Sequence, residues 1–164
     1  MARRSATLRL VSTFSVHLDP RGTGHDDVIV GIAGHELRSD SYYLRLDPSL
    51  WPDREDTTKA RAVLRVLLER LLAAVRELDE GGAAYLAHDV SDEYTGWLQL
   101  RREGGDIALM SGYSSAHGHT MTPSEDGVTT EPPADLHPLH VDYPRIPHDA
   151  LLAQLATSLA ALTD

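Results

Sequence analysis

Histidine is the residue type in this sequence with the clearest capacity for chemistry, because nine occur in 164 residues. His117 and His119 are the tightest pair, and on a strand two histidines at positions i and i+2 point to the same face. Both could then reach one divalent metal ion such as zinc, with His140 as a third candidate ligand. The alternative interpretation is that all three are exposed loop histidines beside a proline-rich segment.

Catalytic chemistry is less well supported by the residue pattern. The chain has no cysteine, which excludes a cysteine nucleophile, thiolate zinc sites and disulfides. Ser114 and Ser115 lie near His117, but the Gly-x-Ser-x-Gly sequence of a nucleophile elbow does not occur. Gly22-x-Gly24 lacks the third glycine of a phosphate-binding loop. The sequence therefore favours a non-enzymatic protein without a cofactor, and a divalent metal is the alternative.

A different kind of site is suggested by residues 88–97, where three carboxylates stand beside two aromatic rings. Acidic side chains can steer a basic partner, and tyrosine or tryptophan can supply buried contact area. The alternative is that Asp and Ser are simply good turn residues there. Two further acids lie in a later loop. The candidate partner contacts are Asp89, Asp92, Glu93, Tyr94, Glu125 and Asp126.

The charge of the chain is unevenly distributed, and its total is -10 at pH 7. Residues 1–82 hold 13 acids and 12 bases, whereas residues 83–164 hold 12 acids and 3 bases. Such a balance excludes nonspecific binding to phosphate backbones, which needs lysine and arginine. The acidic second half serves either solubility or attraction of a basic partner.

The elements that would position these residues can be predicted from periodicity. Alternating apolar and polar residues, which are typical of strands with one buried face, occupy residues 8–18 and 42–46, and a short β-branched run at residues 28–32 predicts a strand between them. Apolar residues then recur at three- and four-residue steps from about Thr57 to Leu78, which predicts a helix that Gly81-Gly82 ends.

The second half repeats this arrangement. Ala83–His88 can form a strand, and two extended runs flank Gly104-Gly105, which predicts a hairpin. Residues 121–147 are rich in proline and form a loop region with at most one short strand, and a final helix begins near His148. The order βββαβββα predicts an α+β fold in which two helices pack on one face of a mainly antiparallel sheet of about six strands. The length predicts a single domain over residues 1–164.

Part of the chain resembles a known group of proteins. The residues that carry the resemblance are His88-Asp89-Val90-Ser91-Asp92-Glu93, Gly96-Trp97-Leu98, Gly112-Tyr113-Ser114, Gly118 and Pro123-Ser124. This pattern resembles small bacterial (actinobacterial) α+β proteins of immunity-like type, mainly over residues 42–124. The resemblance implies partner binding and no catalytic motif, and it assigns no role to an individual residue.

Together these observations predict a non-enzymatic protein-interaction module, immunity- or antitoxin-like, that presents an acidic face to a basic protein. One alternative is a domain that binds a metal or small ligand through His117 and His119, and another is a structural, oligomer-forming component. The apolar runs are too short to cross a membrane, and Thr7–Leu18 is no signal-peptide core. We therefore expect a cytoplasmic protein that binds neither membrane nor nucleic acid directly.

Overall fold

A computed structural model describes most of the chain. The described residues are 14–19, 27–32, 34–40, 56–91, 93–116, 127–139 and 145–162, although the side chains of residues 56–59 are not described. The elements run in the order β1 (Phe14–Leu18), β2 (Val28–Ile32), β3 (His35–Ser39), α2 (Asp56–Glu77), β4 (Ala83–Val90), β5 (Thr95–Glu103), β6 (Asp106–Ser114), β7 (Val128–Thr129), β8 (His137–Pro138), β9 (Arg145–Pro147) and α4 (His148–Ala160). The predicted α+β class and the order βββαβββα are confirmed.

The strands form two antiparallel sheets rather than one. The smaller sheet has the order β1-β2-β3, and Gly34, at a φ of 87°, makes the tight connection between β2 and β3. The third described strand, β3, lies at His35–Ser39, where no strand was predicted. Residues 42–46 lie outside the described residues, as do residues 8–13 of the predicted first strand.

The larger sheet has the order β7-β4-β5-β6-β8, and β9 also pairs with β6. The predicted hairpin is confirmed, since β5 and β6 meet at Gly104 and Gly105, which both have positive φ. The proline-rich region contributes three short strands, β7, β8 and β9, where at most one was expected. Strand β4 contains a register shift between Ala87 and Asp89, so that His88 is the extra residue of a bulge.

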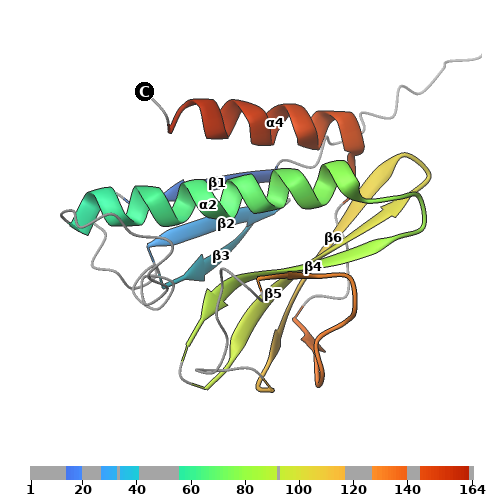
Figure 1. The fold of residues 1–164 in the computed structure, drawn as a ribbon, viewed down its shortest axis with the longest axis horizontal. Coiled ribbons are helices and arrows are strands. Elements are labelled where there is room, and N and C mark those ends of the chain that lie inside the picture. The colour runs from blue at the N-terminus through green and yellow to red at the C-terminus, as the bar shows by residue number, and fades with distance from the viewer. Residues whose placement is uncertain are drawn as a thin grey trace, which may run out of the picture.

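Both helices form as their apolar stripes predict. The long helix α2 ends at Glu77, and Gly81, whose φ of 79° only glycine adopts easily, lies in the turn that follows. Helix α4 starts directly after Pro147, and its first residue is tied to α2 because His148 Nε2 lies 3.1 Å from the carbonyl oxygen of Val75. Figure 1 shows the two helices running beside each other, and both contact β1 of the small sheet.

The main core is shared by all the large elements. It contains buried residues of both helices, of the small sheet, and of β4, β5 and β6, with Leu68, Leu86 and Leu98 almost fully buried. Each such leucine stabilises the fold by roughly 1.5–3 kcal/mol relative to an exposed one. A second cluster of Tyr85, Ala87, Val90 and Trp97 on the large sheet is contacted by Val63 of α2 and partly covered by Leu136.

In the part of the chain that the structure describes, no helix has the length and apolar character needed to cross a membrane.

Candidate functional site

The turn between β4 and β5 is held in one conformation by Ser91. The Ser91 hydroxyl oxygen accepts hydrogen bonds from the backbone N–H groups of Glu93 (3.3 Å) and Tyr94 (3.1 Å). The same hydroxyl and the Ser91 backbone N–H both donate to the carbonyl oxygen of Tyr94, at 3.1 and 2.9 Å. Such serine-centred turns hold their backbone with local bonds. The turn therefore presents Glu93 and Tyr94 at an exposed tip whose backbone is held by local bonds.

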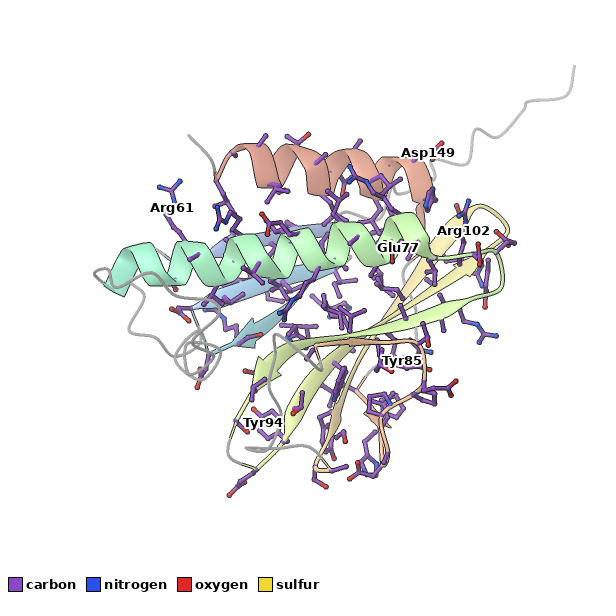
Figure 2. The ribbon with its side chains drawn as sticks, viewed as in Figure 1. Arg61, Glu77, Tyr85, Tyr94, Arg102 and Asp149 are labelled. Atoms are coloured by element: carbon purple, nitrogen blue, oxygen red, sulfur yellow. The ribbon has the colours of Figure 1, made fainter. Side chains whose placement is uncertain are left out.

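Tyr94 belongs to a row of three rings that crosses the end of the large sheet. Its ring centroid lies 6.4 Å from that of Tyr113 on β6, with the ring planes at 74°. Tyr113 in turn stacks on His137 of β8, at 5.2 Å and 29°. Both tyrosines are 40% exposed although they are large and mostly apolar. We call Tyr94, Tyr113 and His137 the aromatic strip. Figure 2 shows Tyr94 at the end of the sheet away from the helices, which Arg61, Glu77 and Asp149 mark.

The position of His137 is fixed by backbone pairing and by a glycine. Tyr113 pairs with His137 in the register of β6 and β8, and Gly112 pairs with Pro138. A Cβ atom on Gly112 would lie 2.8 Å from the carbonyl oxygen of His137, closer than real Cβ contacts. Only glycine lets β8 approach β6 this closely. The stack of Tyr113 on His137 therefore depends on Gly112.

Asp135 stabilises the same region through hydrogen bonds to residues 114–116. One oxygen of its carboxylate accepts the Ser114 hydroxyl at 2.6 Å and the Ala116 N–H at 3.3 Å. The other accepts the hydroxyl (2.6 Å) and the N–H (3.2 Å) of Ser115. These bonds, the Ser114 hydroxyl first and then the Ser115 hydroxyl, lower the pKa of Asp135 from 3.8 to about 2. The ionised carboxylate thus holds the end of β6 against the segment that leads into β8.

A second polar cluster is buried where the two sheets meet. His88, in the bulge of β4, is 4% exposed, and its Nδ1 lies 2.8 Å from the hydroxyl oxygen of Ser39 in β3, which is 1% exposed. Burial lowers the pKa of His88 to about 4, so the ring is neutral at pH 7. Gly96 makes room for it, because a Cβ there would lie 3.1 Å from His88 Nε2.

This serine–histidine pair is closed to a substrate. A nucleophilic serine must reach a carbonyl carbon, and neither Ser39 nor His88 exposes more than a few per cent of its surface. Their hydrogen bond instead links the edge of the small sheet to the large one. We assign the pair a structural role.

The structure brings together only some of the predicted partner contacts. Glu93 and Tyr94 are exposed and adjacent on the turn. Asp89 is buried, at 7% exposure, and its Oδ1 accepts the N–H of Asp40 at 3.1 Å, so this carboxylate is not part of the exposed surface. Asp92, Glu125 and Asp126 lie outside the described residues.

The predicted metal ligands His117, His119 and His140 also lie outside the described residues, and the metal hypothesis stays a prediction. Among the residues that are described, no group of three or more histidine, aspartate or glutamate side chains could hold an ion.

Sequence reasoning did not identify Tyr113 and His137 as site residues. Tyr113 falls in the stretch on which the predicted resemblance rests, and no other feature of the sequence indicated it. A comparison with known protein families, curated proteins and solved structures finds no match for this chain. The function has to be inferred from the geometry of the aromatic strip and its neighbouring charges.

Proposed function

We propose that this protein is a non-enzymatic interaction module that binds a basic partner protein through the aromatic strip and Glu93. The observation that carries the proposal is the exposure of Tyr94 and Tyr113, 40% each, in one row with His137. Contiguous exposed rings on a folded surface are typical of binding sites, and tyrosine is enriched among the residues that dominate binding energy.

The rigidity of the strip supports this proposal. The hydrogen bonds of Ser91 fix the turn that carries Tyr94. The bonds of Asp135 and the close backbone approach at Gly112 fix the position of β8, which carries His137. A surface that is already ordered loses little conformational freedom when a partner binds, so more of the contact energy remains as affinity.

Electrostatics supports a basic partner. Glu93 is exposed beside Tyr94, and residues 83–164, which supply the whole strip, carry 12 acids and 3 bases. An acidic surface speeds association with a basic protein, and an inhibitor of a nucleic-acid enzyme would use the basic groove that its target already has. The proposal therefore includes an immunity- or antitoxin-like role in the cytoplasm, without direct binding of nucleic acid.

The proposal is tested by affinity capture from an extract of the cells that make the protein, at low and at high salt. The bait is the full chain, as wild type and as the double variant Tyr94→Ser, Tyr113→Ser. We expect a basic protein that the wild type captures and the double variant loses, because truncating an aromatic anchor costs about 2 kcal/mol or more. High salt should weaken the capture.

The matched control is Val128→Ser, which changes another exposed apolar side chain, 39% exposed, on β7 at the opposite edge of the sheet. It should capture the same protein as the wild type. Thermal unfolding of all baits establishes that each is folded. Identical captured proteins from the wild type and the folded double variant would overturn the proposal.

A further inference from the structure

The rings of Tyr94 and Tyr113 meet at an angle on the surface of the protein. The two ring planes stand at 74° with their centroids 6.4 Å apart, and both rings are 40% exposed. His137 stacks on Tyr113 and holds that ring in place. The contact is edge-to-face, so the two nearly perpendicular rings, one from the β4–β5 turn and one from β6, form a corner at the end of the sheet.

We propose that this corner binds the guanidinium group of an arginine side chain of the basic partner. The inference rests on the proposed function and names the side chain that the strip recognises. Guanidinium is planar, so it can stack on one tyrosine ring while its N–H edge is directed at the face of the other, nearly perpendicular ring. A lysine ammonium is a compact, more strongly hydrated charge without a plane, and it uses such a corner less well.

The charges around the corner favour a cation. Glu93 precedes Tyr94 at the exposed tip of the turn, where its carboxylate can pair with an arginine N–H group. Asp135, two residues before His137, remains ionised at neutral pH, but the hydroxyl and N–H groups of residues 114–116 occupy its oxygens. Asp135 therefore adds negative potential, while Glu93 is the carboxylate that can bind directly.

The test uses three synthetic peptides of equal length, hexa-arginine, hexa-lysine and hexa-citrulline, titrated into the folded full chain and followed by NMR. Citrulline has nearly the shape of arginine without its charge. We expect hexa-arginine to bind most tightly, with an upfield ring-current shift of its Cδ protons, which stacking on a ring produces and simple charge attraction does not. Hexa-citrulline should bind far more weakly than either cationic peptide.

Variants then locate the binding. Tyr94→Leu and Tyr113→Leu should each weaken hexa-arginine binding by about two- to five-fold and reduce the ring-current shift, which matches the usual strength of an exposed cation–π contact. Glu93→Gln should weaken both cationic peptides. The controls are Val128→Ala for loss of an exposed apolar group and Glu36→Gln, on the small sheet, for loss of an exposed charge. Both should bind like the wild type.

Each unfavourable outcome has a defined meaning. Equal binding of hexa-arginine and hexa-lysine, or no effect of the tyrosine variants on hexa-arginine, would overturn the arginine inference. Equal binding of hexa-citrulline would overturn it too, because the strip would then recognise flat groups without regard to charge. If the captured partner still depends on both tyrosines in any of these cases, the proposed function stands and only its arginine recognition fails.

Discussion

At the scale of single residues, His88 makes the stability of the fold depend on pH. Its folded pKa, about 4, lies below the 6.5 of an unfolded histidine because burial disfavours the charged ring. Between pH 6.5 and 4 the unfolded chain binds a proton that the folded chain does not, so the unfolding free energy falls as the pH falls. The stability that the neutral ring provides is fully present above pH 6.5, and about 3 kcal/mol of it is lost by pH 4.

The prediction is tested with His88→Asn, which keeps a polar atom near Nδ1 for the Ser39 hydroxyl but does not titrate. Unfolding by urea, measured from pH 7.5 to 4, should show a shallower loss of stability for this variant than for the wild type. Ser39→Ala is the control: it should be less stable at every pH, by roughly 1–3 kcal/mol, and should keep the pH dependence. Parallel curves for His88→Asn and the wild type would contradict the assignment.

At the scale of elements, the docking of β8 on β6 decides whether the aromatic strip exists. Gly112→Ala places a Cβ 2.8 Å from the backbone oxygen of His137, and a backbone atom cannot move aside as a flexible side chain can. We expect β8 to shift, the unfolding free energy to fall by about 1–3 kcal/mol, and Tyr113 to lose its stack on His137. The ring NMR signals of Tyr113 and His137 report this loss directly.

The matched control for this prediction is the neighbouring Ser111→Ala. The Ser111 hydroxyl is buried without a hydrogen-bond partner among the described residues, so its removal should leave β8 in place and the stability equal or higher. Unchanged ring signals in Gly112→Ala would contradict this prediction and show that β8 keeps its place on β6 without the glycine.

The elements that the sequence predicted well are those with local signals. The helix expected over residues 57–78 is found at Asp56–Glu77, and the Gly104-Gly105 hairpin is found where the two glycines indicated it. Strand β3 was missed because three of its five side chains, His35, Glu36 and Arg38, are exposed and polar, so apolar alternation is absent. Charged edge strands protect a sheet against unwanted pairing, and they carry little hydrophobic pattern.

The candidate site divides in the same way. Glu93 and Tyr94 were predicted as site residues from residue type alone, because acids beside an aromatic ring are recognisable in a turn. The contact of Tyr113 with His137 depends on the pairing of β6 with β8, which lies across a long connection and leaves no local trace. Asp89 was expected at the surface, but the bulge at His88 interrupts the alternation of β4, and Asp89 bonds to Asp40 instead.

At the scale of the whole molecule, one shared core joins the two sheets and the two helices. Strand β5 connects this core to the second cluster, because Leu98 and Leu100 belong to the main core while Trp97 belongs to the other. The buried Ser39–His88 bond and the His148–Val75 bond add polar links between parts that are distant in the sequence. None of the large elements that the structure describes has a core of its own. We therefore expect the protein to unfold in one transition.

Leu155→Ala tests this expectation. Leu155 of α4 is 1% exposed in the main core, and its truncation should lower the unfolding free energy by about 2–5 kcal/mol. Far-UV circular dichroism and the fluorescence of Trp97, in a Trp51→Phe background, should still give coincident transitions, although Trp97 lies in the other cluster. Ala156→Ser, exposed on the same helix, should stay within about 0.5 kcal/mol of the parent.

If the Trp97 transition stayed in place while the helical signal was lost earlier, the helices would unfold separately. The aromatic strip would then be carried by the large sheet and its connections alone, because its residues and supports lie on β6, on β8 and the segment before it, and on the β4–β5 turn.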